Sequence, residues 1–279
     1  RSLELRETLL GSNPNSAQAA RDVSVSLSKL ADFLARRGQT GDAQAALGYY
    51  ERSLEIDEAL LRSNPNSAQA ARDVSVSLNK LADFLASRGQ TGDAQAALGH
   101  YQRCLEILEA LLRSNPNSAQ AARDVSVSLN KLADFLASRD QTGDAQSALG
   151  HYERSLEIDE TLLRSNPNSA QAARDVSVAL ERLAETEAQR PDGAARALAL
   201  QLRSLEIALQ LRERNPASWF YQRTAAMAYF LSSQRAQAAD NRELATQCLG
   251  GCYAVLDPLI QAGVEIDADM RGLHAELGG

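Results

Sequence analysis

A sequence repeat with a period of 51 residues constrains the fold of this chain more than any other feature. The tetrapeptide Arg-Ser-Leu-Glu, or a close variant, recurs at a spacing of 51 residues three times and then 49; its copies begin at Arg1, Arg52, Arg103, Arg154 and Arg203. The segments 63–113 and 114–164 differ at only six positions, namely Gly89/Asp140, Ala96/Ser147, Gln102/Glu153, Cys104/Ser155, Leu108/Asp159 and Ala110/Thr161. Such a period indicates one supersecondary unit stacked on copies of itself, because a single unit cannot bury its own apolar face.

Each copy is predicted to form two antiparallel helices. Asn64-Pro65-Asn66-Ser67 ends one helix and begins the next, because proline cannot continue a helix and Ser67 is a good N-cap. From there to about Arg88 the apolar residues recur at steps of three and four, as they do on one face of a helix; they are Ala70, Val74, Leu78, Leu81 and Leu85. The glycines of Gly89–Asp93 predict a turn, and a second helix is predicted from about Asp93 to Arg113. The breaks in every copy exclude a long coiled coil.

The repeats are expected to occupy most of the chain. We expect a repeat array over residues 1–214, with a partial repeat at 1–12 and repeats at 13–63, 64–114, 115–165 and 166–214. Residues 215–279 are expected to form a divergent C-terminal repeat, whose second helix ends near Asp257-Pro258, and a capping helix at about 267–277. The chain opens without a methionine in the middle of a repeat, so we expect it to be a fragment of a longer protein.

The order of small and large residues within each copy resembles the tetratricopeptide repeat (TPR) family. In the copy 64–114 the resemblance is carried by Leu81-Ala82, Leu85, Gly92-Asp93, Ala97-Leu98, Tyr101 and Leu105. The family's usual period is about 34 residues, so this chain is similar to the long-helix variety found in large bacterial signalling and scaffold proteins. The resemblance covers nearly the whole chain and implies an all-α fold, an α-solenoid of stacked antiparallel helix hairpins forming a right-handed superhelix.

The resemblance also implies where a partner would bind, because in the family the first helices line the concave surface. The polar residues at the matched positions are Ser28, Lys29, Asp32, Asn79, Lys80, Asp83, Asn130, Lys131, Asp134, Glu181, Arg182 and Glu185, with Val25, Val76, Val127 and Val178 on the same helical face. These residues either hydrogen-bond an extended partner or form a solvated face with pairs such as Lys80–Asp83, each worth about 0.2–0.5 kcal/mol. Because the acidic residues would repel a carboxylate, the expected ligand is a neutral or basic protein segment.

Two further features have both a structural and a binding interpretation. The Arg-Asp dipeptides can form a ladder in which the arginine of one copy meets the aspartate of the next, or they can contact a partner; they begin at Arg21, Arg72, Arg123 and Arg174. Aromatic residues crowd the first helix of the divergent repeat. Trp219, Phe220 and Tyr221 can close the core as a terminal cap, or they can form an aromatic docking patch.

Residues with catalytic or metal-binding chemistry are few. His100 and His151 occupy the position of Tyr49 in another copy, which indicates exchangeable repeat residues. Cys248 and Cys252 have the spacing of two metal ligands on one helical face, but no further His or Cys pair completes a set of four, so small core residues are the expected interpretation. We find no nucleophile with a base and no phosphate-binding loop. The sequence predicts no enzyme activity, metal or cofactor.

Composition narrows the class of partner. The net charge of −7 argues against binding a nucleic-acid backbone, which needs a basic face. No apolar run approaches the roughly 20 residues that cross a bilayer, and three irregularly placed cysteines indicate a reducing compartment, so a cytoplasmic location is expected. We expect a non-catalytic protein–protein interaction scaffold that binds a peptide or protein. The alternative is a structural, self-associating or sensor-regulatory array of a larger multidomain bacterial signalling protein.

Overall fold

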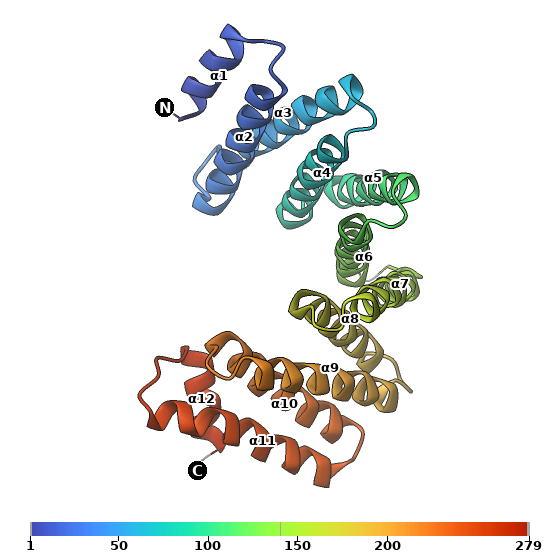
Figure 1. Ribbon diagram of the computed structural model, residues 1–279, viewed down its shortest axis with the longest axis vertical. Coiled ribbons are helices and arrows are strands. Elements are labelled where there is room, and N and C mark those ends of the chain that lie inside the picture. The colour runs from blue at the N-terminus through green and yellow to red at the C-terminus, as the bar shows by residue number, and fades with distance from the viewer. Residues whose placement is uncertain (1, 140, 278–279) are drawn as a thin grey trace. The chain divides into compact units, whose positions relative to one another are not determined.

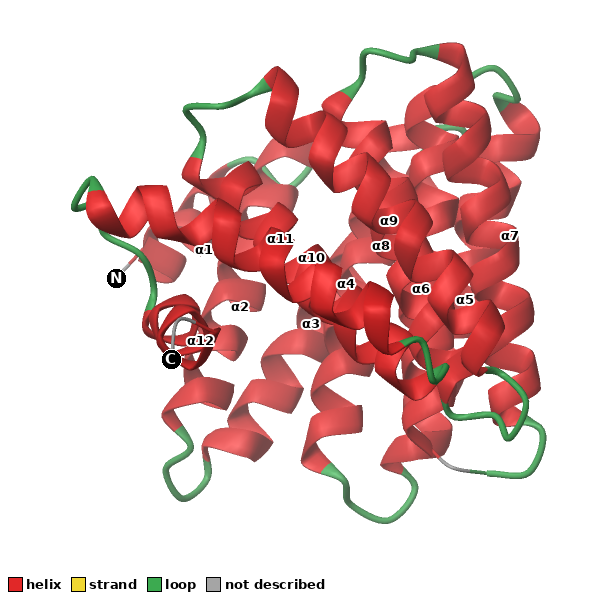
Figure 2. Cartoon of the chain, turned by 90° about the horizontal axis from the view of Figure 1, so that it is seen from below, coloured by secondary structure: helices red, strands yellow, loops and turns green. Residues whose placement is uncertain are grey.

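The computed structural model describes residues 2–139 and 141–277, and within these ranges its regular elements are helices (Figure 2). The helices are α1 Ser2–Ser12, α2 Ala17–Arg37, α3 Asp42–Ser63, α4 Ala68–Arg88, α5 Asp93–Ser114, α6 Ala119–Arg139, α7 Asp144–Ser165, α8 Ala170–Ala188, α9 Ala194–Arg214, α10 Trp219–Ala238, α11 Arg242–Gln261 and α12 Ala268–Leu277. The chain divides into two compact units, residues 1–144 and 145–279. The predicted all-α architecture of consecutive helix hairpins is confirmed (Figure 1).

The helices begin and end at the capping residues and glycines that the sequence predicted. Ser67 caps α4, and its hydroxyl accepts a hydrogen bond of 3.1 Å from the backbone N–H of Ala70. At the other end of α4, Gly89 has a φ of 62°, in the left-handed region where a side chain would be strained, and its N–H bonds the carbonyl of Leu85. The helix pair predicted for the copy 64–114 is therefore confirmed as α4 and α5.

In unit 1 each first helix contributes a fully buried leucine and each second helix a wide buried face. Leu27, Leu78 and Leu129 occupy the same position in α2, α4 and α6, and all three are 0% exposed. In α5 the buried face includes Ala97, Tyr101, Cys104, Leu105, Leu108 and Leu111. Aromatic pairs join successive copies, because Tyr50 of α3 packs on Phe84 of α4 with ring centroids 5.3 Å apart, and Tyr101 of α5 packs on Phe135 of α6 at 5.2 Å.

In unit 2, α12 closes the C-terminal end of the apolar core. Met270 and Leu273 of α12 pack with Ala226 of α10 and with Cys252 and Leu256 of α11. An ion pair of 2.6 Å between Arg223 of α10 and Asp267 also holds the segment before α12 against α10. The short helix that the sequence predicts at about 267–277 is present at Ala268–Leu277. Its role as a cap of the repeat array stays a prediction.

The predicted end of α11 near Asp257-Pro258 is wrong, because the helix continues through Pro258 to Gln261. A proline removes one backbone hydrogen bond and crowds the preceding turn. Here Leu256 is fully buried and Ile260 packs against the same apolar cluster, so tertiary packing holds the last turn in place. The N–H of Ala262 bonds the carbonyl of Pro258 at 3.0 Å, which completes that turn.

An arginine–aspartate pair fastens the turn between the two helices of a copy. The guanidinium of Arg88, at the end of α4, donates to both carboxylate oxygens of Asp93 at 2.8 and 2.6 Å, and the N–H of Gln90 donates to Asp93 at 2.9 Å. Arg37–Asp42 and Arg139–Asp144 repeat the pair. The hydrogen bonds from Arg88 lower the pKa of Asp93 below its usual value.

Replacing Asp93 by asparagine is expected to make the stability of the chain less dependent on pH below about 4. The folded-state pKa of Asp93 is depressed, so its stabilising contribution is complete above the unfolded-state pKa and is lost as pH falls through the folded-state pKa. Urea unfolding at several pH values between about 2 and 7 measures this dependence. Asp240→Asn is the control, because Asp240 is 94% exposed; an equal loss of stability with acid in the wild type and in Asp93→Asn would contradict the expectation.

Candidate functional site

The face of unit 1 formed by α2, α4 and α6 gathers the predicted groove residues, and we call it the first-helix face. Ser28 and Lys29 of α2 and Lys80 of α4 line one pocket of about 170 Å³ on this face, together with Val25 and Val76. Asp32 and Asp83 line a second pocket, of about 390 Å³, with Lys80 as a shared wall. The structure thus brings together five candidate residues of the first two copies, Ser28, Lys29, Asp32, Lys80 and Asp83.

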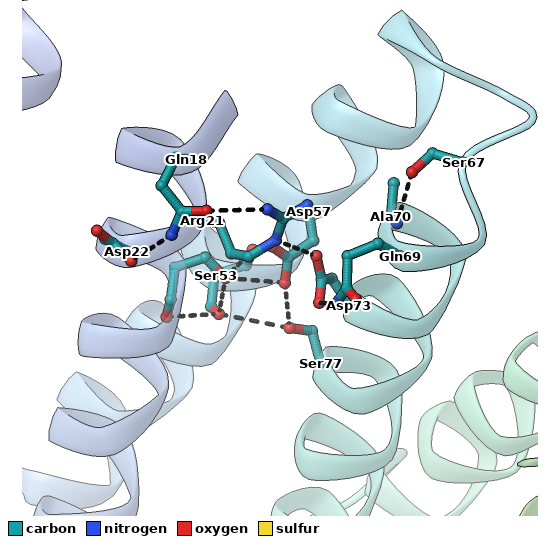
Figure 3. A network of polar contacts seen from close by, with 11 residues as sticks. Gln18, Arg21, Asp22, Ser53, Asp57, Ser67, Gln69, Ala70, Asp73 and Ser77 are labelled. Atoms are coloured by element: carbon teal, nitrogen blue, oxygen red, sulfur yellow. Dashed lines mark hydrogen bonds and ion pairs between the residues drawn. The ribbon is translucent and has the colours of Figure 1, made fainter. Parts of the chain in front are cut away.

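Two rows of ion pairs cross the first-helix face, and each pair joins one copy to the next. In the first row Arg21 of α2 contacts Asp73 of α4 at 2.6 Å (Figure 3), and Arg72 of α4 contacts Asp124 of α6 at 2.7 Å. A glutamine one turn earlier supports each acid; Gln69, for example, donates to Asp73 at 2.8 Å. The inter-repeat ladder predicted from the Arg-Asp dipeptides is confirmed for these two pairs.

The second row joins lysines to aspartates of the preceding copy. Lys131 of α6 contacts Asp83 of α4 at 2.8 Å, and Lys80 of α4 contacts Asp32 of α2. The pairing of Lys80 with Asp83 within one helix, which was one of the two alternatives, is not formed; Lys80 pairs with Asp32. At a spacing of three residues the two side chains share a face, but Asp32 lies across the gap between helices and receives both Lys80 and the hydroxyl of Tyr50, which donates at 2.7 Å.

Because lysines pair with aspartates in the second row, the first-helix face carries less uncompensated negative charge than the sequence suggested. Burial raises the pKa of Asp32, but the hydrogen bonds from Lys80 and Tyr50 outweigh burial, so the pKa lies below its usual value and the carboxylate is ionised. Each acid on this row faces an ammonium group, so its charge is compensated within the protein. Asp32 and Asp83 consequently help to join neighbouring copies.

A double-mutant cycle on Arg72 and Asp124 is expected to give a coupling free energy of about 1 kcal/mol at low salt. The two side chains are 30% and 18% exposed, and the coupling should weaken in about 1 M NaCl because mobile ions screen the pair. The measurement is urea unfolding of the two single alanine variants and the double variant. Arg62 and Glu58 form the control pair, since they lie within one helix and Arg62 is 66% exposed, and about 0.3 kcal/mol is expected there. Equal coupling free energies in the two pairs would show that the inter-repeat ion pair stabilises the fold no more than an ion pair within one helix.

Ion pairs along the second helices give the arginine of the recurring tetrapeptide a role that the sequence pattern did not reveal. Arg52 of α3 contacts Glu7 of α1 at 2.8 Å, and Arg103 of α5 contacts Glu58 of α3 at 2.6 Å. In unit 2, Arg203 of α9 contacts Glu160 of α7. The arginine and the acid sit 45 or 43 residues apart, so only knowledge of how neighbouring copies are offset could have identified them.

In unit 2 the fourth copy presents a different set of groove positions on α8. Glu181 turns inward and accepts hydrogen bonds from Ser204 of α9 at 2.8 Å and from Ser177 at 3.5 Å, and burial raises its pKa. Arg182 and Glu185 stay at the surface with their charged atoms 3.9 Å apart. Of these three candidates, Arg182 and Glu185 are exposed to a partner.

The three terminal aromatic candidates have separate environments. Trp219 packs against the apolar cluster that α12 closes, as the capping interpretation expects. Phe220 is 52% exposed, its ring meets Tyr221 edge-on at 5.2 Å, and the guanidinium of Arg174 lies 5.4 Å from its centroid. Only Phe220 and Tyr221 remain as a candidate docking pair.

The residues with metal-binding chemistry are dispersed or buried. Cys248 and Cys252 are core residues of unit 2, 3% and 0% exposed. Across residues 2–139 and 141–277, no three His, Cys, Asp or Glu side chains are gathered as they would be around a metal ion. Within the same described ranges, each helix is too short or too polar to span a lipid bilayer.

Solved structures share this arrangement of helices. BtubC (BKLC) from P. vanneervenii superposes with a TM-score of 0.67 over 96% of this chain and 91% of that protein, at 19% identity. The nearly identical TPR-like repeats of a Podosopora anserina protein assigned as a kinesin light chain superpose with a TM-score of 0.52, over 84% of this chain and 96% of theirs, at 16% identity. This chain has a TPR-like helical repeat fold. At these identities the likeness concerns the fold of the TPR-like repeats alone.

Sequence comparison gives a relative that matches about half of this chain. The protein NCA1 of Arabidopsis thaliana is 30% identical over 152 residues, which cover 53% of this chain and 35% of that protein. The chain therefore spans about a third of the length of this curated relative. No protein-family model matches the chain.

Proposed function

We propose that the chain is a non-catalytic protein-interaction scaffold whose first-helix face holds an extended segment of a protein partner. The observation that carries the proposal is a row of exposed valines at one register, Val25 at 43%, Val76 at 55% and Val127 at 40%. Buried leucines two residues further on already supply the core of each first helix. An apolar side chain repeated at the surface of each copy, between two rows of ion pairs, is suited to contact with a partner.

The two rows of ion pairs also indicate which charge a partner of the first-helix face should carry. The first-helix face offers apolar contact from the valines and hydrogen bonds from polar side chains between them. Four of its aspartates are matched by lysines and arginines of neighbouring copies, namely Asp32, Asp73, Asp83 and Asp124. An acidic segment would gain little from such a compensated surface. We propose a neutral or basic segment, and a cytoplasmic setting for the encounter.

The experiment compares partner capture by the wild-type chain and by the triple variant Val25→Ser, Val76→Ser, Val127→Ser. The matched control replaces three exposed second-helix residues, Gln44, Gln95 and Gln102, by serine. The proposal expects partner recovery to fall at least about tenfold in the valine variant and to stay unchanged in the control, since about 1.4 kcal/mol of lost contact energy suffices. Retention of the partner by the valine variant would contradict it.

A second candidate function is self-association as a structural array, and it rests on a different observation. Leu5 and Leu9 of α1 are 61% and 64% exposed. Light scattering of the chain over a wide concentration range tests this function, because self-association predicts a rising mass and a constant monomer mass contradicts it. A sensor-regulatory role in a larger bacterial signalling protein would be supported by an effector domain in the full-length gene.

A further inference from the structure

The arginine–aspartate ladder differs at Arg174 of unit 2. In unit 1, Nε of Arg21 contacts Asp73 at 2.6 Å (Figure 3). Nε of Arg72 contacts Asp124 in the same way, at 2.7 Å. Arg174 of α8 stands at the corresponding position of its copy, but its guanidinium forms no ion pair with any residue that the structure describes. Its Nε is covered by protein and has no hydrogen-bond partner within the described ranges, so the contact made by the other two arginines is missing there.

The divergent repeat carries a different residue at the position of the acid. Counted from the N-cap of each helix, Thr224 of α10 corresponds to Asp73 of α4. Phe220 corresponds to Gln69, which supports Asp73 with a hydrogen bond of 2.8 Å. The Phe220 ring lies beside Arg174, with 5.4 Å between the guanidinium carbon and the ring centroid. A cation–π contact attracts the charge but offers no hydrogen-bond acceptor, so Arg174 can still bind a carboxylate.

The surroundings of Arg174 are open to a partner. Arg174 is only partly buried, and its hydrogen bond to Gln171, of 2.7 Å, lies at the surface. Phe220 is 52% exposed, and Val178, one turn further along α8, is 46% exposed. A carboxylate can therefore reach the terminal nitrogens of the guanidinium without opening the core. A cation next to exposed apolar side chains suits a segment with an acid beside an apolar residue.

The chain itself shows that a segment outside the repeated helices can supply such an acid. Arg223 of α10 is the arginine at the same position of the divergent repeat, and its Nε contacts Asp267 at 2.6 Å. Asp267 lies just before α12, so this acid does not come from a first helix. Ile266, next to it, is 3% exposed and belongs to the apolar cluster on which Trp219 packs. An apolar residue followed by an aspartate thus binds an arginine of this series and the start of α10 together.

We propose that Arg174 binds an aspartate side chain of a protein partner, with an apolar residue of the same segment on Phe220. The carboxylate would contact Arg174 as Asp267 contacts Arg223, through charge-assisted hydrogen bonds that are about twice as strong as neutral ones. This site belongs to unit 2 and goes beyond the function proposed for the first-helix face. A segment bound there carries an acid, unlike the neutral or basic segment proposed for unit 1.

The test is an NMR titration of the full chain with the N-acetyl methylamides of isoleucyl-aspartate and isoleucyl-asparagine. The two probes have the same shape and differ in the carboxylate. The aspartate probe is expected to shift the methyl signals of Val178 and Thr224 saturably and to bind at least about fivefold more tightly than the asparagine probe. This preference should decline in about 1 M NaCl, because mobile ions screen the charges. Val25 lies beside Arg21, which already has its acid, so its methyl signals should not distinguish the two probes.

Two variants test the arginine independently of each other. Arg174→Gln removes the charge and is expected to abolish the preference for the aspartate probe. Thr224→Asp restores the acid that the other copies carry; it is expected to occupy Arg174, to abolish the same preference and to raise the urea concentration at the unfolding midpoint. Equal binding of the two probes, a preference that survives in either variant, or no saturable shift at all would overturn the inference. Partner capture by the valine variant of unit 1 is a separate measurement, so the two proposals can fail separately.

Discussion

Alanine at Gly193 is expected to destabilise unit 2 by about 3 kcal/mol, a large effect for the addition of one methyl group. Gly193 is buried in the turn between α8 and α9, and a Cβ built on it would lie 1.7 Å from the carbonyl oxygen of Glu187. That oxygen belongs to the backbone of the last turn of α8, so no side-chain rotation relieves the overlap. Urea unfolding followed by circular dichroism at 222 nm measures the loss.

Gly99→Ala is the matched control for this substitution. Gly99 lies inside α5, and nothing lies within 4 Å of a Cβ built there. Alanine is the better helix former, so the control is expected to raise stability by about 0.5–1 kcal/mol. If the two substitutions changed the unfolding free energy by similar amounts, the close approach at Gly193 would be contradicted.

Leu78→Ala is expected to destabilise the chain by about 3 kcal/mol, because it leaves a cavity in the core of the first helices. Leu78 is 0% exposed, and its copy packs against neighbours on both sides, so a weakened α4 loosens two interfaces. The measurement is the midpoint and slope of urea unfolding. A loss of this size would make Leu78 one of the larger single contributors in unit 1.

Val76→Ala tests the same helix two residues away. Val76 is 55% exposed, and its removal is expected to change the unfolding free energy by less than about 0.5 kcal/mol. The contrast separates the side chain that holds the fold from the side chain assigned to binding. Equal losses at the two positions would show that the exposed valines are structural.

The helices of this chain could be predicted because the residues that begin and end them act locally. Pro65 and Ser67 act within one turn of the chain, and so does Gly89, so the boundaries of α4 and α5 follow from adjacent residues. The repeat then extends these boundaries from copy to copy. Pro258 is the exception, since distant apolar contacts decide where α11 ends.

The polar architecture could be predicted only in part, because it depends on how neighbouring copies are offset. Helical spacing places Lys80 and Asp83 on one face, but it does not show that Lys80 reaches Asp32 of the preceding copy. The Arg-Asp dipeptide suggested a ladder because the two partners recur at the same level of adjacent helices. Arg103 and Glu58 recur at different levels, so their pairing needed the structure.

The buried carboxyl of Asp57 is an example of a structural difference between copies that their nearly identical sequences hide. Cys104 and Leu108 are two of the six differences between the segments 63–113 and 114–164, and nothing in the sequence links them. In the structure these two positions occupy the floor beneath adjacent first helices, where Ser53 and Asp57 stand in the preceding copy. Two of these six substitutions thus decide whether the buried floor of a copy is polar or apolar.

Site-specific photo-cross-linking tests the binding role of the first-helix face most directly. The chain carries the photoreactive residue p-benzoylphenylalanine either at Val76, on the first-helix face, or at Gln102, at an exposed position of α5. A partner is expected to cross-link from position 76 and not from position 102, and that product is expected to be lost when Val25→Ser and Val127→Ser are added. A product formed from position 102 alone, or one that survives both valine substitutions, would contradict this expectation.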